Sequence, residues 1–301
     1  MYDIVILTDS RYEKPETTDW YINQVILEDT LLLEALKEKG CTVIRKSWDA
    51  QDFDWATCNY AIFRTTWDYF DRYAEFFSWF EKTQKILHFI NAPELIYWNL
   101  DKHYLTDLKQ QQINIPPTLF LEKGTQENLK TLLEEKGWQQ AVLKPAIGGG
   151  GRETFKITKH NATEHQVHFE KLLAQEALLF QEFQDHIISQ GEISLMMMNG
   201  IYTHAVLKKA KSGDFRVQDD FGGSVEKYTA KKEEINFAEK ALSACPLPPL
   251  YARVDVFYDN SNCLALGELE LIEPELWFRN HPQAATLLAE AVVNYMNTKH
   301  R

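Results

Sequence analysis

The chain has 301 residues, 45% hydrophobic and 25% charged, which is enough for two domains or one large α/β domain with a substantial core. Its 32 basic and 44 acidic residues give a net charge of −12, which argues against nucleic acid or an anionic membrane as the main partner. The four cysteines form no C-x-x-C pair, residues 1–20 lack a signal-peptide pattern, and no window approaches the ~20 apolar residues of a membrane helix. We therefore expect a soluble, cytoplasmic protein.

The first part of the chain alternates strand-like and helix-like segments. Apolar runs and helical periodicity predict the order strand 3–7, helix 31–36, strand 42–44, strand 60–63, helix 70–80 and strand 86–90. Strands that alternate with helices imply a parallel sheet with both faces covered. Ligands of such sheets lie beyond the carboxyl ends of the strands, here in the loops after Leu7 and Phe63.

From Asn99 onward the pattern is that of a mixed α+β unit. The predicted order is helix 101–112, an extended segment at 115–118, helix 126–136, strand 141–146, strand 154–158, helix 163–177 and strand 178–183. It continues with a hairpin over 192–209 that turns at Asn199-Gly200, helix 235–245, a second hairpin formed by 251–258 and 263–272, and helix 282–296. The fold class is therefore α/β with α+β character.

Four consecutive glycines, Gly148 to Gly151, follow a strand-like run that carries Lys144. A linker would lack structure on both sides, a P-loop requires a Gly-Lys pair, and a dinucleotide fingerprint requires a glycine that opens a helix. None of these fits, because strand patterns flank the run and no Gly-Lys pair occurs in the chain. Glycine lets backbone N–H groups wrap an anion, so we interpret the run as a lid over phosphates, with an ordinary hairpin tip as the alternative.

Carboxylates interrupt the apolar strands of the last predicted hairpin. Glu268 and Glu270 are two residues apart and project from the same face of a strand, and Asp255 lies on the partner strand. Buried carboxylates are costly unless cations intervene, and oxygen ligands without histidine or cysteine favour Mg²⁺. The alternatives are a solvated hairpin face and ion pairing with Arg253.

A phosphate lid with magnesium carboxylates describes a nucleoside triphosphate site, and at this point the sequence resembles the ATP-grasp ligases. The resemblance covers roughly residues 99–273 and follows the family order. Asn99-Leu-Asp-Lys102 resembles the element whose lysine contacts ATP. Leu143-Lys144-Pro145 resembles the second lysine, and its lid is formed by Gly148, Gly149, Gly150 and Gly151.

The same resemblance implies roles for the remaining ATP-site positions. Gln181, Glu182 and Phe183 correspond to the hinge strand that reads adenine, Glu192 to the acidic ribose contact, and Arg216 to the phosphate-binding arginine. The magnesium ligands correspond to Asp255, Glu268 and Glu270, although many members carry asparagine at the last position. The resemblance thus implies ATP and two Mg²⁺ ions as cofactors, with Mn²⁺ as an alternative, and assigns catalytic roles to Lys144 and Arg216.

The resemblance also implies an ATP-grasp fold in three parts. These are an N-terminal parallel-sheet preATP-grasp substrate domain at 1–97, an ATP-grasp lid subdomain at 98–180, and a C-terminal ATP-grasp subdomain with the magnesium site at 181–301. The phrases RTTWDY, NLDKHYL and GELELIEP are similar to the branch that contains D-cycloserine synthetase, which closes a ring on an amino-acid-derived carboxylate.

The implied activity is an ATP- and Mg²⁺-dependent carboxylate–amine (or related) ligase that acts through an acylphosphate on a small amino-acid-like substrate. An ATP-grasp kinase that stops at phosphoryl transfer is one alternative, and a nucleotide-binding sensor without turnover is another. The oligomeric state stays open, a homo-oligomer included.

Candidate substrate residues follow the first and third predicted strands. The RTTWDY run offers an arginine, hydroxyls and aromatic rings together, and its candidate residues are Arg64, Thr65 and Asp68. Arg64 can bind a substrate carboxylate bidentately, and a structural salt bridge is an equally good interpretation. Ser10, at the end of the first strand, belongs to a second candidate patch. Lys208 and Lys209 are weaker candidates, since lysine pairs are usually solvated.

Overall fold

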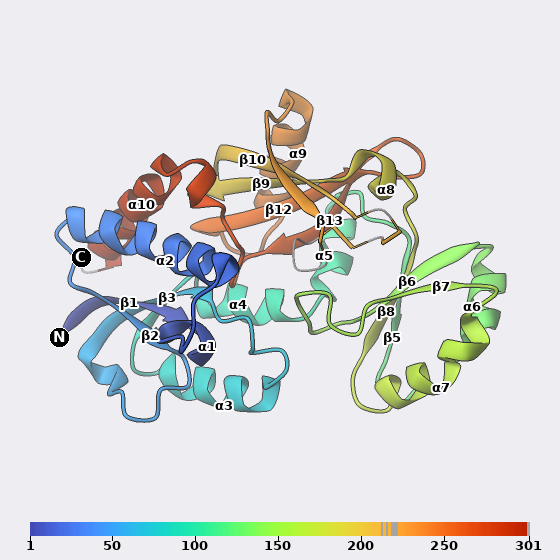
Figure 1. Ribbon diagram of the computed structural model, residues 1–301, viewed down its shortest axis with the longest axis horizontal. Coiled ribbons are helices and arrows are strands. Elements are labelled where there is room, and N and C mark those ends of the chain that lie inside the picture. The colour runs from blue at the N-terminus through green and yellow to red at the C-terminus, as the bar shows by residue number, and fades with distance from the viewer. Residues whose placement is uncertain (212, 215, 218–221, 300–301) are drawn as a thin grey trace.

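The computed structural model describes residues 1–211, 213–214, 216–217 and 222–299. These residues form three sheets with their helices, arranged as three lobes (Figure 1). In Figure 1 the N-terminal lobe lies at the left, the lobe of β5–β8 at the right, and the third sheet spans the top. Within the described ranges, no helix has both the length and the apolar character needed to cross a membrane.

The N-terminal sheet is parallel, as predicted, with the strand order β2-β1-β3-β4. Its strands are β1 (Tyr2–Thr8), β2 (Val43–Ser47), β3 (Cys58–Thr65) and β4 (His88–Ile90). The accompanying helices are α1 (Ser10–Glu13), α2 (Trp20–Glu38), the 3₁₀ turn η1 (Trp55–Thr57), α3 (Tyr73–Thr83) and α4 (Pro93–Leu100). The apolar runs of β1 and β3 are buried almost throughout, as strands covered on both faces require.

The second sheet is antiparallel, in the order β5-β8-β6-β7. Its strands are β5 (Thr118–Leu121), β6 (Gln140–Pro145), β7 (Phe155–Thr158) and β8 (Leu178–Glu182). Helix α5 (Tyr104–Gln110) leads into it, and α6 (Leu129–Lys136) and α7 (Ala162–Leu173) share its buried core. The glycine run joins β6 to β7, which confirms its predicted place between two strands.

The third sheet is antiparallel, in the order β11-β10-β9-β12-β13. Its strands are β9 (Glu192–Met198), β10 (Ile201–Lys209), β11 (Ser224–Tyr228), β12 (Tyr251–Tyr258) and β13 (Leu264–Glu270). The remaining helices are α8 (His186–Gln190), α9 (Lys232–Ser243), the 3₁₀ turn η3 (Phe278–Asn280) and α10 (Gln283–Lys299). Asn199 and Gly200 both have positive φ angles, 51° and 78°, as the predicted two-residue hairpin turn requires.

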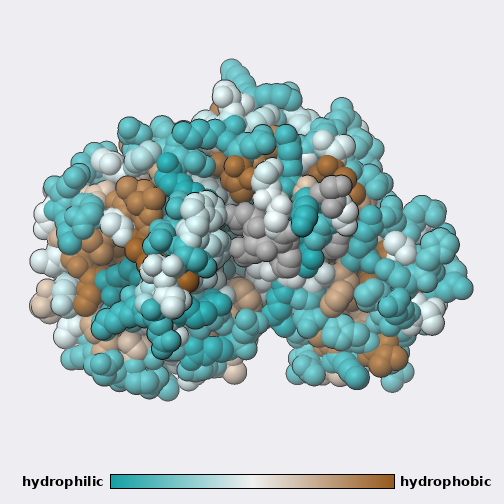
Figure 2. All heavy atoms as spheres, in the orientation of Figure 1, coloured by the Kyte–Doolittle hydropathy of each residue, from teal (hydrophilic) through white to brown (hydrophobic). Residues whose placement is uncertain are grey.

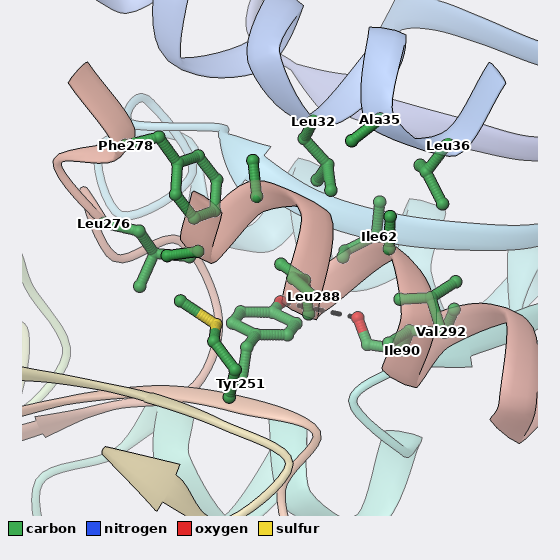
Figure 3. Packing of buried hydrophobic residues seen from close by; sticks show 14 of the residues in the cluster. Leu32, Ala35, Leu36, Ile62, Ile90, Tyr251, Leu276, Phe278, Leu288 and Val292 are labelled. Atoms are coloured by element: carbon green, nitrogen blue, oxygen red, sulfur yellow. Dashed lines mark hydrogen bonds between the residues drawn. The ribbon is translucent and has the colours of Figure 1, made fainter. Parts of the chain in front are cut away.

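The C-terminal helix α10 packs against α2 of the N-terminal lobe. Figure 3 shows the shared core, in which Leu32 and Leu36 of α2 face Leu288 and Val292 of α10, with Tyr251 of β12 beneath them. The first and third sheets therefore share one buried cluster. The three domain ranges stay a prediction: the cut at 180/181 falls inside β8, and α10 returns to the N-terminal lobe.

Candidate functional site

A cavity of about 430 Å³ opens between the three sheets. The mostly hydrophilic surface is notched between the N-terminal lobe and the β5–β8 lobe (Figure 2). The structure brings all the predicted ATP and metal residues to this cavity. Its lining includes Lys102, Lys144, Gly148, Gly149, Gly150, Gly151, Gln181, Glu182, Phe183, Glu192, Arg216, Asp255, Glu268 and Glu270.

Lys102 links the glycine run to the acidic strand. Its backbone N–H donates to the carbonyl of Ala146 at 2.9 Å, so the chain turns here and the predicted helix 101–112 begins only at Tyr104. Its ammonium donates to the carbonyl of Gly148 at 2.5 Å and pairs with Glu268 at 3.0 Å. One buried cation thus spans the floor of the cavity.

Lys144 lies on β6, beside the start of the glycine run. Within the part of the chain that the structure describes, its ammonium has no ion-pair or hydrogen-bond partner. Burial lowers the pKa of Lys144, with Lys102 acting in the same direction and Glu268 against it. A buried cation without a partner is costly, so an anionic ligand at this position would be stabilised.

Hydrogen bonds fix both ends of the glycine run, and two of its glycines have a left-handed backbone conformation. Gly150 and Gly151 have φ angles of 55° and 70°, which residues with side chains rarely adopt. Arg152 pairs with Glu176 at 2.5 Å and donates to the carbonyl of Ile147 at 3.0 Å. The backbone of the run can therefore approach a ligand without side chains in between.

The predicted adenine strand ends at the cavity, but its amides are engaged within the protein. Glu182 N–H donates to the carbonyl of Pro117 at 2.9 Å, and Phe183 N–H to that of Gln140 at 3.1 Å. The ammonium of Lys156 lies 3.8 Å from the centroid of the Phe183 ring. The assignment of Gln181, Glu182 and Phe183 to adenine binding stays a prediction, with the ring face already covered by a cation.

Arg216 also lines the cavity and pairs with Asp214 at 2.8 Å. The predicted motif Gly213-Asp-Phe-Arg216 includes Phe215, which lies outside the described residues. The guanidinium of Arg216 is about one-third exposed, so a ligand can reach it. Its predicted phosphate contact is compatible with this position.

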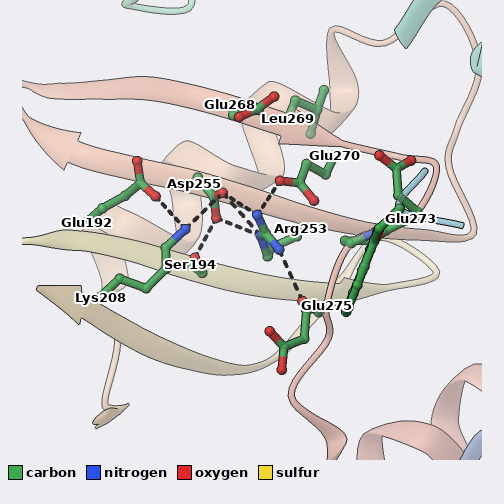
Figure 4. A network of polar contacts seen from close by, with 12 residues as sticks. Glu192, Ser194, Lys208, Arg253, Asp255, Glu268, Leu269, Glu270, Glu273 and Glu275 are labelled. Atoms are coloured by element: carbon green, nitrogen blue, oxygen red, sulfur yellow. Dashed lines mark hydrogen bonds and ion pairs between the residues drawn. The ribbon is translucent and has the colours of Figure 1, made fainter. Parts of the chain in front are cut away.

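Carboxylates of β12 and β13 form ion pairs with a basic residue of the same strands. In the β12–β13 pair, Asp255 lies opposite Glu268, and Arg253 lies opposite Glu270. Arg253 donates to Asp255 at 2.9 Å and also pairs with Glu270 (Figure 4). The predicted facing of Asp255 and Glu268 is confirmed, and the pairing with Arg253 that the sequence left open is also present.

Lys208 completes this network, and its interpretation as a solvated lysine was wrong. It is 4% exposed and contacts Glu192 at 2.5 Å and Asp255 at 3.2 Å. Ser194 donates a further hydrogen bond to Asp255 at 2.5 Å. The signal was the two-residue periodicity of β10, in which Lys208 shares the buried face with Val206.

The carboxylates of the β12–β13 pair fall into two groups, which differ in the direction of their pKa shifts. Although burial opposes ionisation, Arg253 and Lys208 lower the pKa of Asp255 to about 2, and Lys102 and Lys144 lower that of Glu268. Burial raises the pKa of Glu270 to about 8, with Glu268 and Asp255 adding to the rise against the effect of Arg253. A further cation beside Glu268 and Glu270 would relieve this repulsion.

The donor set fits Mg²⁺ in kind, since carboxylate oxygens are the ligands that this ion prefers. In the described ranges, however, no three histidine, cysteine, aspartate or glutamate side chains are gathered as metal ligands. Asp255 is occupied by Ser194, Lys208 and Arg253. Glu268 and Glu270 pair with one cation each and are more exposed than Asp255, so of these three they are more open to a metal.

The predicted substrate residues lie outside the cavity lining. Arg64 is completely buried, pairs with Glu28 at 3.3 Å and donates to a backbone carbonyl at 2.9 Å. Thr65 is also buried, and its hydroxyl bonds Asp29 at 2.8 Å. The structural salt bridge that the sequence left open for Arg64 is what the structure shows.

The other two substrate candidates are placed elsewhere as well. Asp68 accepts a hydrogen bond from the indole of Trp48 at 2.7 Å and pairs with Arg72 at 2.8 Å. Ser10 borders a separate hollow together with Lys46. Both therefore lie apart from the ATP and metal residues.

Aromatic residues reach the cavity from the N-terminal lobe, and sequence reasoning named those of the Arg64–Tyr69 run, Trp67 included, but missed the others. Trp67 and Phe70 belong to the same loop after β3 that was singled out, and Tyr12 and Tyr21 join them. The rule that ligands lie beyond the carboxyl ends of parallel strands identified the loop. It could not say which of its side chains point inward.

Two family models match successive parts of the chain. Residues 4–91 match the family model of the D-cycloserine synthetase DcsG N-terminal domain, and residues 103–245 match that of the prokaryotic glutathione synthetase ATP-grasp domain. The cycloserine biosynthesis protein DcsG of Streptomyces lavendulae is 26% identical over 275 residues, which are 87% of this chain and 91% of that protein.

Solved structures with the same fold include two ligases. The crystal structure of D-cycloserine synthetase DcsG has a TM-score of 0.86 at 24% identity and covers 97% of this chain and 99% of its own. That of D-alanine–D-alanine ligase from Bacillus anthracis complexed with ATP has a TM-score of 0.63 at 13% identity, with coverages of 98% and 97%.

Proposed function

The chain belongs to the ATP-grasp ligases, and we propose that it activates the carboxyl group of a small amino-acid-like substrate with ATP and joins it to an amine or related nucleophile. Members of this family are enzymes that bind ATP and use Mg²⁺.

The observation that carries the proposal is the ammonium of Lys144. It is largely buried, lines the cavity beside the glycine run and has no partner among the described residues. Lys102 lies nearby and bridges Gly148 to Glu268. This arrangement suits a polyphosphate that enters under the glycines and meets two lysines on one side and metal-binding carboxylates on the other.

The proposed site residues form three groups, each with its own task. Lys102, Lys144 and Arg216 offset the negative charge of the triphosphate. Asp255, Glu268 and Glu270 would hold Mg²⁺, two ions in this proposal or Mn²⁺ in its place. When bound, the metal neutralises phosphate oxygens that transfer or leave. Arg253 and Lys208 keep Asp255 ionised and oriented.

The reaction proceeds in two steps. A substrate carboxylate oxygen attacks the γ-phosphorus, which gives an acylphosphate and ADP. The nucleophile then attacks the acyl carbon, the C–O bond to phosphate breaks, and inorganic phosphate leaves. Because an acylphosphate is easily hydrolysed, the glycine run has a physical task in excluding water.

The match of residues 4–91 to the D-cycloserine synthetase domain supports an amino-acid-derived carboxylate. Purified protein should be incubated with ATP, Mg²⁺ and a panel of D- and L-amino acids and their side-chain derivatives, with and without hydroxylamine. We expect ADP and a hydroxamate only with the matching carboxylate, because hydroxylamine traps an acylphosphate. A phosphorylated product that persists in hydroxylamine would favour the kinase, and tight ATP binding without ADP release the sensor.

A further inference from the structure

Phe70 of the N-terminal lobe lies against the glycine run of the lid. A Cβ atom added at Gly149 would lie 2.8 Å from Cε1 of Phe70, closer than real Cβ contacts come, and 3.2 Å from its Cδ1, which is already tight. One at Gly148 would meet nothing nearer than 3.6 Å. Gly149 also lacks the positive φ of its two successors. The restriction at Gly149 is therefore the space that Phe70 occupies.

Phe70 belongs to a loop of residues 66–72, between β3 and α3, that is fixed from several sides. Asp68 anchors the base of the loop through Trp48 and Arg72. The indole of Trp67 donates to the carbonyl of Glu273 at 2.9 Å, just beyond β13. Tyr69 is buried and packs edge-on against Phe70, with ring centroids 5.4 Å apart. The loop thus connects the acidic strand to the glycine run.

We propose that Phe70 is a positioning residue that sets where the glycine run comes to rest over the cavity. The run then reaches its seated position only against a correctly placed 66–72 loop, so closure over ATP is tied to the position of the N-terminal lobe. This inference rests on the proposed function. Its chemical consequence is that Phe70 protects the acylphosphate from water without touching the reacting atoms.

The first test measures how well ATP use is coupled to ligation. For Phe70→Ala we expect the ratio of ADP released to product ligated to rise on the order of tenfold, with kcat for ligation lowered and KM for ATP little changed. Phe77→Ala is the matched control, because Phe77 is a half-buried aromatic residue on α3 that packs on Tyr73 and Tyr97. A wild-type ratio in Phe70→Ala, or the same rise in Phe77→Ala, would overturn the proposal.

The second test asks whether removal of the Phe70 ring rescues a variant that has a side chain at Gly149. Gly149→Ala should lose ligase activity, and Phe70→Ala in the same chain should restore part of it by opening the space that the new methyl group needs. The matched pair is Gly148→Ala with and without Phe70→Ala, for which we expect no such gain. Wild-type activity in Gly149→Ala, no gain in the double variant, or an equal gain for both glycines would each contradict the contact.

A third measurement separates this inference from the proposed function. Amide hydrogen exchange of residues 146–154 should be faster in Phe70→Ala than in the wild type and in Phe77→Ala, with no substrate present. If the wild type turns over no substrate while this difference appears, the contact stands and the ligase proposal fails. Equal exchange in all three proteins would overturn the positioning role whatever the reaction.

Discussion

Two walls of the cavity differ in how their charges are paired. The glycine wall, formed by β6 and the glycine run, presents Lys144, which has no partner among the described residues. The β12–β13 wall presents carboxylates that are already paired with the protein's own cations. Lys144 is a partly buried cation and Arg253 a buried one, and of these two only Arg253 is paired among the described residues, with Asp255 and Glu270. The difference separates two uses of a buried charge. In the proposed function one cation, Lys144, is kept for a ligand, and the other, Arg253, holds neighbouring side chains in place.

The largest effect on stability is expected from Arg253→Met. Removing this guanidinium leaves Asp255 and Glu270 buried without their main counter-charge, which should lower the free energy of unfolding by about 3–5 kcal/mol. Urea unfolding measures the change, and Lys144→Met is the matched control. If the two variants lose equal stability, the contrast between the two walls is wrong.

Glu268→Gln should lower kcat on the order of 100-fold while the fold stays intact. The amide keeps the shape of the side chain but removes the charge that pairs with Lys102 and would hold the metal. Steady-state kinetics over a range of Mg²⁺ concentrations, together with circular dichroism, measure both parts. Turnover at the wild-type rate would remove Glu268 from the metal site.

Lys144→Met removes the charge from the glycine side of the cavity. We expect ATP affinity to fall on the order of 10-fold, because a charge-assisted contact to phosphate is lost. Stability should stay the same or increase slightly, since a partly buried ammonium with no partner among the described residues is replaced by an apolar chain of similar length. Calorimetric titration with ATP and Mg²⁺ checks the first part, and a marked loss of stability would show that Lys144 has a structural role.

A smaller effect is expected at Glu28, which ties α2 to the chain after β13. Its carboxylate accepts from the backbone N–H groups of Leu276 and Phe278, at 2.7 and 2.9 Å, and pairs with Arg64. Burial raises the pKa of Glu28 to about 7, against the effect of Arg64. Between its usual pKa and 7 the native state thus holds a proton that the unfolded chain has lost, so this group makes stability fall as pH rises.

Glu28→Gln should remove that contribution. The difference in unfolding free energy between wild type and variant should shrink by about 1–3 kcal/mol between about pH 5 and about pH 8, and level off above the folded pKa. Urea unfolding at intervals across this range measures it. A difference that does not change with pH would show that Glu28 titrates normally.

Local patterns predicted most elements because the strands and helices of this chain have clear periodicity. The glycine run, the Asn199-Gly200 turn and the Asp255–Glu268 pairing all depend on neighbours in sequence or in one hairpin. The predicted α/β class is confirmed for the same reason, whereas the roles assigned to the single motifs stay predictions.

Contacts between distant segments could not be predicted in this way. Arg64 is a structural residue because Glu28 of α2 reaches it across the lobe, and no local pattern encodes that meeting. The approach of Phe70 to Gly149 joins two lobes, and α10 returns to α2 from the far end of the chain. Such placements depend on how the three sheets pack, which single-segment periodicity does not contain.

The most direct test of the proposed ligase is the fate of the substrate's carboxylate oxygen. With the matching substrate labelled with ¹⁸O in its carboxyl group, ATP, Mg²⁺ and the nucleophile, we predict one ¹⁸O atom in each phosphate released. That transfer requires the carboxylate oxygen to have attacked the γ-phosphorus. Ligated product formed together with unlabelled phosphate would contradict the acylphosphate route and the assignment of the cavity to it.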